Sequence, residues 1–232
     1  MEVTHAWEKV DAAGTVLALK YSFGPGTANT LVARLDDDTL LAVSPASGLP
    51  PAVLDALAER GDVSALVAPN AYHHMGHKAW RARWPNAVSY APDGAMARLA
   101  KKCPDVPFEP LTKLAPHLGS RVELLVPPDM KTPDLLVRVD TPDGNVWFLG
   151  DLVSNLTKAD LRLPVRMLFR LLGGGPGLRF NKVPTMVYLK DKAAWRAWVR
   201  EQLALAPVAV AVPAHGDLVR DDAAARLAAA LA

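Results

Sequence analysis

The sequence predicts a mixed α/β protein in which helices cover the faces of β-sheets. Short apolar runs bounded by glycine, proline and aspartate predict strands, and the amphipathic stretches between them predict helices. Several β segments lie in each half of the chain. This distribution is compatible with two sheets that pack face to face, with the helices outside them.

Length and composition are those of an ordinary globular protein. The chain has 232 residues, of which 50% are hydrophobic and 22% are charged, so it can bury a core of normal size. The net charge is +2, with basic and acidic residues interleaved, so nucleic acid is not an expected partner. A single cysteine, Cys103, excludes an intrachain disulfide and a multi-cysteine zinc site. No signal peptide or apolar stretch of ~18 residues is visible, so we expect a cytoplasmic protein without membrane contact.

The first half of the chain predicts a β-meander followed by alternating strands and helices. Turn residues at Gly24-Pro25-Gly26 and Asp36-Asp37-Asp38 separate the strands of the meander. A helix begins at Leu49-Pro50-Pro51 and ends before Gly61. The predicted strands are 16–20, 31–35, 39–43, 63–68 and 87–91, and a second helix is predicted near 94–102.

The second half predicts further strands and two long helices. Thr141-Pro142-Asp143-Gly144 is typical of a hairpin turn between two of the strands. Trp195, Trp198 and Val199 fall on one face of an amphipathic helix and are expected in the core. The predicted strands are 122–126, 134–139, 145–149 and 208–212, and the predicted helices are 190–204 and 218–231.

Residues 152–188 differ from this pattern and are predicted to be a helical insertion. The stretch 162–177 (RLPVRMLFRLLGGGPG) is both basic and strongly apolar. Its leucines could enter the core, cover a site as an exposed cap, or form the interface of a homodimer. The glycines at 173–175 lack the residues of a phosphate-binding loop and are interpreted as a turn.

Three predicted strands end in residues that can bind metal or catalyse a reaction. Strand 63–68 leads into the histidine-rich loop NAYHHMGHKAW, strand 145–149 ends at Gly150-Asp151, and strand 208–212 leads to His215. Sites in α/β folds form where loops converge at strand ends. Taken one at a time, Asp151 could instead be a helix N-cap and His215 a structural turn residue.

The histidine-rich loop allows more than one geometry. His73 and His77 are four residues apart, as in a helical zinc pair, but that motif requires a Glu where His74 stands. Gly76 also weakens a helix by ~1 kcal/mol. A loop is therefore the preferred prediction, with His74 and His77 pointing to neighbouring corners of a site.

The order of these features resembles the metallo-β-lactamase superfamily over nearly the whole chain. The resemblance rests on the meander, the histidine loop, Gly150-Asp151 at a strand end, and Ala214-His215-Gly216 near the end of the sequence. Ala68-Pro69-Asn70 before the His-His pair is similar to an uncharacterised branch of the superfamily. The resemblance implies a four-layer αββα sandwich, 1–232 as one domain, and a metal site at the sheet edge.

The superfamily's metal-binding motif is incomplete in this chain. When His-x-His-x-Asp-His is laid on the sequence with His77 last, the first His falls on Tyr72 and the Asp on Gly76. Lys131 stands where a later His ligand would be. The resemblance thus retains His74, His77, Asp151 and His215, the last three of which could hold one ion with water as the fourth ligand.

Two functional hypotheses follow from this incomplete motif. In the first, one zinc, iron or manganese ion supports hydrolysis of an unknown small molecule, with Asp151, Tyr72 and His73 as catalytic residues; Tyr72 would donate a hydrogen bond to an oxyanion. In the second, the protein binds no metal, Lys131 neutralises Asp151, and the chain is an inactive binding or scaffold module. β-Lactamase activity is not expected, because the fold does not fix the substrate.

Overall fold

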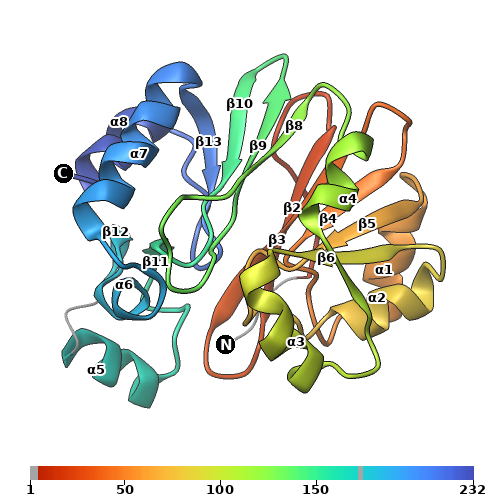
Figure 1. Ribbon diagram of the computed structural model, residues 1–232, viewed down its shortest axis with the longest axis horizontal. Coiled ribbons are helices and arrows are strands. Elements are labelled where there is room, and N and C mark those ends of the chain that lie inside the picture. Colours follow the sequence, from red (N-terminus) through yellow and green to blue (C-terminus); the bar gives the residue numbers. More distant parts are fainter. Residues whose placement is uncertain (1–4, 172–174) are drawn as a thin grey trace.

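The computed structural model describes residues 5–171 and 175–232 (Figure 1). Two β-sheets lie face to face at the centre of the molecule, and helices cover the outer face of each sheet. These layers confirm the predicted αββα sandwich.

The first sheet contains seven strands in sequence order. Neighbouring strands pair antiparallel from β1 to β4, which is the predicted meander, and parallel from β4 to β7. The parallel pairs are joined through helices, as parallel connections require. The strands are β1 (Glu8–Lys9), β2 (Val16–Ser22), β3 (Thr27–Arg34), β4 (Leu40–Val43), β5 (Val63–Val67), β6 (Val88–Ala91) and β7 (Phe108–Pro110).

The second sheet contains four strands in the order β13-β10-β9-β8. They are β8 (Val122–Leu125), β9 (Leu136–Thr141), β10 (Gly144–Phe148) and β13 (Val208–Val212). β8, β9 and β10 pair antiparallel, whereas β13 returns to pair parallel with β10. Because β10 and β13 run in the same direction, the residues that follow both strands lie at the same edge of the sheet.

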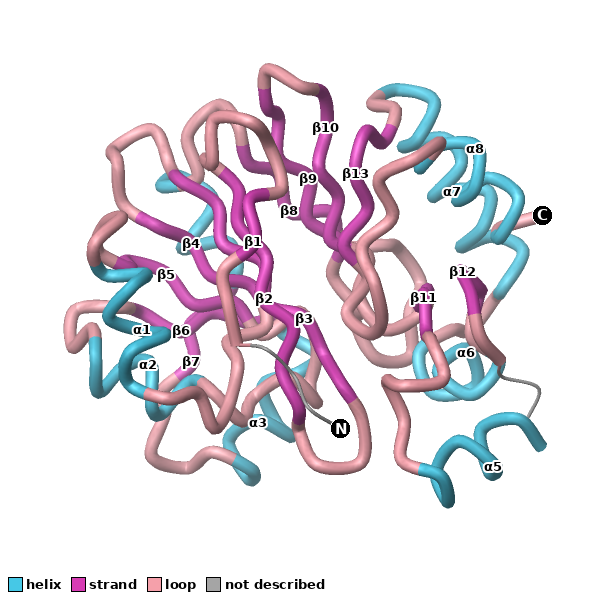
Figure 2. Tube along the Cα trace, turned by 180° about the vertical axis from the view of Figure 1, so that it is seen from behind, coloured by secondary structure: helices cyan, strands magenta, loops and turns pink. Residues whose placement is uncertain are grey.

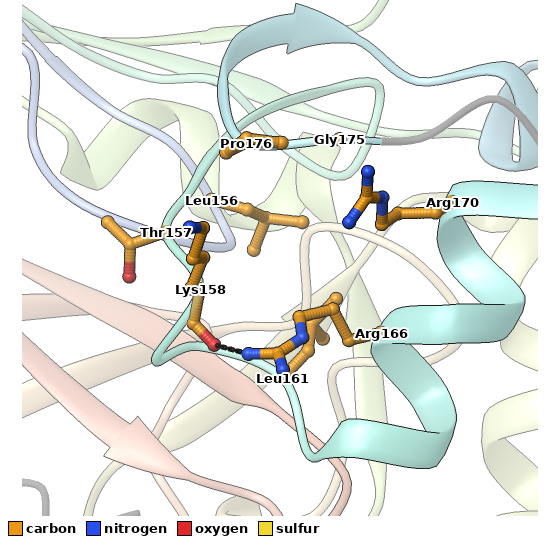
Figure 3. A pocket seen from close by; sticks show the side chains of 8 residues that line it. All are labelled: Leu156, Thr157, Lys158, Leu161, Arg166, Arg170, Gly175 and Pro176. Atoms are coloured by element: carbon orange, nitrogen blue, oxygen red, sulfur yellow. Dashed lines mark hydrogen bonds between the residues drawn. The ribbon is translucent and has the colours of Figure 1, made fainter.

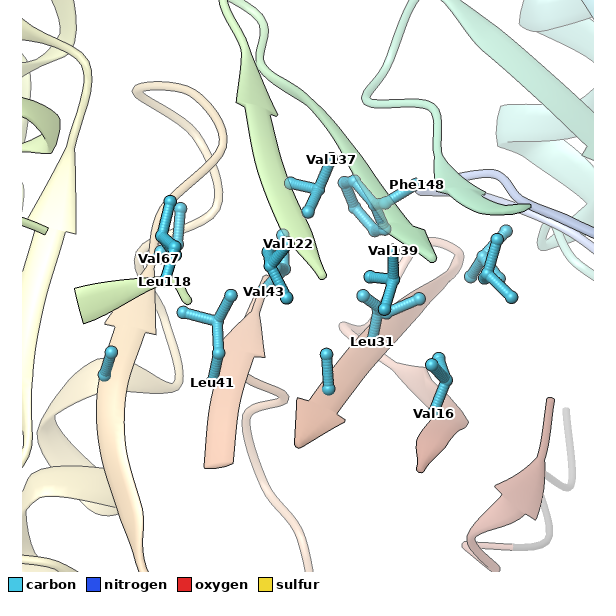
Figure 4. Packing of buried hydrophobic residues seen from close by; sticks show 14 of the residues in the cluster. Val16, Leu31, Leu41, Val43, Val67, Leu118, Val122, Val137, Val139 and Phe148 are labelled. Carbon is cyan, nitrogen blue, oxygen red and sulfur yellow. The ribbon is translucent and has the colours of Figure 1, made fainter. Parts of the chain in front are cut away.

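The core between the sheets is built from small and medium-sized apolar side chains (Figure 4). Val16 and Leu31 point into it, whereas their neighbours Leu17 and Val32 point to the opposite face, toward the helices. Both faces of the first sheet are therefore buried. This explains why the segments 16–19, 31–33 and 40–43 are continuous apolar runs in the sequence rather than alternating ones.

The outer layers are formed by two pairs of helices. α1 (Pro51–Ala58) and α2 (His77–Arg83) cover the first sheet with Leu57, Trp80 and Trp84. α7 (Lys192–Leu205) and α8 (Ala223–Ala230) cover the second sheet; Trp195 of α7 is buried, as predicted. The Asp191 carboxylate caps α7 by accepting hydrogen bonds from the backbone N–H groups of residues 193 and 194, at 2.7 and 3.0 Å.

Residues 152–188 contain strands as well as helices. The strands β11 (Val153–Leu156) and β12 (Gly177–Phe180) pair antiparallel, and the helices are α5 (Leu163–Leu171) and α6 (Lys182–Tyr188). Figures 1 and 2 place α5 and α6 at the same end of the molecule as the β2–β3 turn. A bridge between Gly26 and Leu161 joins the two regions. That this segment is an insertion into one domain stays a prediction.

Several predicted boundaries differ from the structure. The predicted helix 218–231 begins only at Ala223, because the backbone of Val219 pairs with Ala211 of β13 in both directions, at 2.8 and 2.9 Å. α2, β7 and the β11–β12 pair are not predicted from the sequence. The remaining short helices are η1 (Asp93–Ala95), α3 (Met96–Lys102), α4 (Leu111–Leu114) and η2 (Ala115–His117). Across the described residues, none of the helices is both long enough and apolar enough to cross a membrane.

Candidate metal centre

Three strand ends meet at one edge of the sandwich. The loop after β5 carries His73, the segment after β10 carries Asp151, and the loop after β13 carries His215. One ring nitrogen from each histidine and one oxygen of Asp151 all lie within 4.8 Å of one another. The side chains are 6%, 11% and 26% exposed in that order, so the cluster lies inside the protein with His215 nearest to solvent.

The Asp151 carboxylate is held by hydrogen bonds on both of its oxygens. His73 Nε2 lies 2.8 Å from Oδ1 and His215 Nε2 lies 3.2 Å from the same atom. On the other side, Asn70 Nδ2 and Tyr188 Oη donate to Oδ2 at 3.0 and 2.6 Å. Four partners from three segments, namely the loop after β5, α6 and the loop after β13, therefore fix the plane and position of this carboxylate.

The second nitrogen of each histidine is bound to an oxygen on β3 or just after β4. His73 Nδ1 lies 2.7 Å from Ser44 Oγ, and His215 Nδ1 donates to the Thr27 carbonyl at 2.7 Å. A carbonyl oxygen can only accept, so Nδ1 of His215 carries a proton. This orientation leaves Nε2 of both rings facing Asp151, and such support from the far side is typical of metal-binding histidines.

A second carboxyl group, Asp134, lies directly beneath Asp151. Asp134 Oδ2 accepts from the backbone N–H of Asp151 at 2.8 Å, and its Oδ1 accepts from Asn70 Nδ2 at 2.8 Å. Gly150 has a φ of +62°, and a Cβ there would lie 2.6 Å from Asp134 Oδ1. Glycine is therefore required at this position both for its conformation and for the close approach of Asp134.

The pKa values of the two carboxyl groups are shifted in opposite directions. Burial disfavours the charge on Asp151, but the charges and hydrogen bonds of His73 and His215 outweigh it and hold the pKa of Asp151 well below its usual range. Burial and the neighbouring Asp151 charge raise the pKa of Asp134 well above its usual range. Burial also opposes protonation of His215, but its hydrogen bond to Asp151 raises the pKa of the ring overall. The pair therefore carries its negative charge on Asp151.

The cluster opens into a cavity of about 380 Å³, which we call the metal-centre cavity. Asp151 and His215 lie in its wall together with Tyr72 and Tyr188. The rest of the lining is mainly apolar; it includes Phe23, Leu156, Leu161, Val183, Pro184 and Val187. A small number of polar groups in a concave apolar surface is typical of a small-molecule site.

The structure corrects the predicted ligand set at His74 and His77. Residues 71–76 form a loop, as predicted, but it is His73 rather than either of these residues that reaches Asp151. His77 begins α2 and is fully buried; its Nδ1 lies 3.0 Å from Ser89 Oγ and its ring packs on Phe108. Burial and the nearby His74 lower the pKa of His77 to about 3. His77 is therefore a neutral core histidine.

Gly76 lies against the backbone that follows β4. A Cβ at this position would lie 2.1 Å from the Pro45 carbonyl oxygen and 2.5 Å from that of Ala46. No side chain fits against this backbone, so an aspartate is sterically excluded at this position. The loop packs closely on the segment after β4 instead, and that segment supplies Ser44 to His73.

The predicted role of Lys131 is wrong. Its side chain is exposed, and its Nζ donates to the Met186 carbonyl at 3.3 Å instead of pairing with Asp151. The hydrogen-bond partners of Asp151 Oδ2 are Asn70 and Tyr188, and Lys131 is not among them. The version of the metal-free hypothesis that depends on Lys131 is therefore rejected.

Tyr72, predicted as catalytic, lies at the cavity wall. Residue Tyr72 is 41% exposed, its ring meets Tyr188 edge-on with 5.9 Å between the centroids, and the Arg98 guanidinium carbon lies 4.3 Å from the centroid of the Tyr72 ring. These contacts hold the ring beside the site. Donation of a hydrogen bond by Tyr72 during a reaction stays a prediction.

Sequence reasoning missed four residues that support the cluster: Ser44, Asn70, Asp134 and Tyr188. Asn70 follows the predicted strand 63–68, and Asp134 is the first residue of the predicted strand 134–139, so polar residues at strand ends are the signal that points to these two. Tyr188 ends α6, far from any motif, and burial together with the Asp151 charge raises its pKa, so it stays a hydrogen-bond donor. Nothing in the sequence points to that contact.

The donor set fits a single divalent ion. Two imidazole nitrogens and one carboxylate oxygen occur at zinc sites and at non-haem iron sites. The three atoms converge, their far sides are fixed by other groups, and the cavity provides space on the open side. Among the residues that the structure describes, no other group of three His, Cys, Asp or Glu side chains converges in this way.

Comparisons with known proteins give a match in structure but not in sequence. No protein-family profile and no curated protein sequence matches the chain. A metallo-β-lactamase from Hirschia baltica superposes with a TM-score of 0.59 at 16% identity, covering 97% of this chain and 98% of that one. A metallo-β-lactamase from Pontibacter korlensis gives 0.56 at 13%, covering 97% of each chain. The DIM-1 metallo-β-lactamase gives 0.57 at 15%, covering 99% of this chain and 98% of that one. At these identities the likeness establishes a shared fold.

Proposed function

Since this chain has the metallo-β-lactamase fold, we propose that it is a metal-dependent hydrolase with a reduced, single-ion site. The observation that carries the proposal is the convergence of His73, Asp151 and His215 within 4.8 Å at one sheet edge. These three side chains, rather than His74 and His77, would hold the ion.

The proposed ion is zinc, iron or manganese. Histidine nitrogen and carboxylate oxygen are ligands common to all three, and three protein ligands with an open side are typical of catalytic rather than structural sites. When bound, such an ion polarises a carbonyl or phosphoryl oxygen and lowers the pKa of a water molecule to ~7.

The residues around the ligands have separate roles in this proposal. Asn70 and Tyr188 fix the Asp151 carboxylate through its second oxygen, and Asp134 fixes its backbone. Tyr72 lies in the cavity wall, where its hydroxyl group can donate to an oxyanion of the substrate. The apolar lining excludes bulk water and favours a small molecule with an apolar part.

A second candidate function is a metal-free binding module. One observation favours it: Asp151 Oδ1 already has two histidine partners, at 2.8 and 3.2 Å, so the carboxylate can be neutralised by a protonated His215 without any ion. In this version histidine, not Lys131, replaces the metal. A cytoplasmic location and a homodimer formed through residues 162–177 are further predictions.

Metal analysis of the purified chain separates the two candidates. We expect about one equivalent of metal after dialysis against zinc, iron(II) or manganese, and loss of that equivalent in His73→Gln and His215→Gln. The matched control is His74→Gln, which changes the adjacent histidine and should keep the metal. Absence of metal under all three conditions would support the metal-free module. Loss in His74→Gln but not in His73→Gln would reject the proposed ligand set.

A further inference from the structure

A second cavity has a volume of about 340 Å³ (Figure 3). We call it the arginine cavity. Leu156, Lys158 and Leu161 form one side, Arg166 and Arg170 of α5 form another, and Pro176 closes it before β12. None of the described residues that line it is acidic.

The two arginines present their guanidinium groups to the same space. They are four residues apart on α5, so they lie on one face of the helix. Figure 3 shows both side chains extending from α5 toward the segment that follows β11. Arg166 Nη1 donates to the Lys158 carbonyl at 2.9 Å, which fixes that side chain and leaves its other N–H groups for a ligand.

The surrounding segment is strongly basic although the whole chain is nearly neutral. Residues 152–188 contain six Lys and Arg but one acidic residue, Asp160, whereas the chain as a whole has a net charge of +2. Asp160 already accepts hydrogen bonds from Lys20 and Thr27, at 2.9 and 2.7 Å, so it does not neutralise the arginines. The arginine cavity is therefore a place of positive potential that attracts anions.

The two cavities share a wall. Leu156 and Leu161 line both of them, so the arginine cavity continues from the apolar part of the metal-centre cavity. A molecule that extends across these leucines can contact Asp151 and His215 at one end and the arginines at the other. Guanidinium groups bind phosphate and carboxylate through paired N–H donors, which matches this arrangement.

We infer that the arginine cavity binds the anionic group of the substrate, a phosphate or carboxylate carried on an apolar body. The inference rests on the proposed function for the position of the reacting group. Arg166 and Arg170 then determine specificity, because they select anionic substrates over neutral ones of the same shape. The leucine wall accommodates the apolar part between the two ends.

Binding of hexyl phosphate to the full chain tests the inference without any catalytic step. Titration calorimetry on protein treated with a chelator measures the affinity for hexyl phosphate and for hexanol. We expect hexyl phosphate to bind and hexanol to bind at least about tenfold more weakly. The double variant Arg166→Gln with Arg170→Gln should lose at least about tenfold in affinity for hexyl phosphate and little for hexanol.

The matched control removes the same charge elsewhere. Arg200 on α7 and Arg226 on α8 are exposed, and the double variant Arg200→Gln with Arg226→Gln should bind hexyl phosphate as the unchanged chain does. An equal loss in both double variants, or no loss in either, would overturn the inference. Binding of hexyl phosphate is measured without metal. A negative result therefore does not contradict the proposed hydrolase, and a protein that binds no metal can still have the anion site.

A vesicle arm distinguishes a free phosphate from a lipid headgroup. Cosedimentation with phosphatidylglycerol vesicles that is lost in the Arg166 and Arg170 variant assigns the phosphate to a lipid. Binding of hexyl phosphate without cosedimentation assigns it to a freely diffusing molecule. Both results support an arginine-dependent anion site, whereas absence of arginine-dependent binding to either probe contradicts it.

Discussion

At the scale of single residues, Asp151 is the centre of the site. Both of its oxygens are bound, by side chains from the histidine loop, α6 and the loop after β13. His73 connects the carboxylate further to Ser44, in the segment after β4. Because Asn70 and Tyr188 hold Oδ2, the other oxygen, Oδ1, stays directed toward His73 and His215. Metal affinity should therefore depend on residues that do not themselves touch the ion.

Tyr188→Phe tests this dependence. The variant removes the 2.6 Å hydrogen bond to Asp151 Oδ2 while keeping the ring that packs on Tyr72. We expect affinity for zinc to fall by roughly 10- to 100-fold, measured by competition with a chelator. Tyr90→Phe is the matched control, because Tyr90 is also largely buried but lies on β6, outside the cluster. An unchanged affinity in Tyr188→Phe would show that Tyr188 has no part in the site.

At the scale of elements, Asp160 joins the 152–188 segment to the first sheet. Its side chain is 3% exposed and accepts from Lys20 of β2 and Thr27 of β3, and its carbonyl accepts from the Thr27 N–H at 3.0 Å. Lys20 also pairs with Asp217. The position of α5, and thus of the arginine cavity, depends on this attachment.

The attachment should make stability depend on pH. Burial opposes the charge on Asp160, but hydrogen bonds from Lys20, Thr157 and Thr27 outweigh it and lower its pKa. A lowered folded-state pKa stabilises the protein above the unfolded value of ~3.9, and the contribution is lost as the pH falls through the folded value. We expect Asp160→Asn to cost roughly 2 kcal/mol at pH 7 and much less at pH 3, measured by urea unfolding. An equal cost at both pH values contradicts this account.

Asp62→Asn is the matched control for that experiment. Asp62 is exposed in the turn before β5, and only its backbone carbonyl accepts a hydrogen bond, from Leu40. Its replacement should change the unfolding midpoint little at either pH. The comparison separates the anchored carboxylate from the general effect of removing one negative charge.

At the scale of the whole molecule, the sequence is sufficient to predict the layers. Continuous apolar runs such as 63–68 and 208–212 become strands that are buried on both faces, and Trp195 covers the second sheet as expected. Short elements such as β7 and the β11–β12 pair are not predicted, because a strand of three or four residues is too short to show a periodic pattern of apolar residues. Helix α2 escapes because the histidine loop leads directly into it.

The sequence predicts which strand ends form the candidate site, but it does not predict which histidine of the loop takes part. Strand ends place Asp151 and His215 correctly in the cluster, because the directions of β10 and β13 follow from the fold. The choice between His73, His74 and His77 depends on how one loop packs on the Pro45–Ala46 backbone around Gly76. That contact joins residues about thirty positions apart, and no local pattern encodes it. Tyr188 depends in the same way on how α6 docks.

Anomalous diffraction at the zinc edge, from crystals grown with zinc, locates a bound ion relative to His73, Asp151 and His215. We expect one peak, about 2.0–2.2 Å from His73 Nε2, Asp151 Oδ1 and His215 Nε2. A peak beside His74 or His77, or no peak between the three side chains, would contradict this expectation.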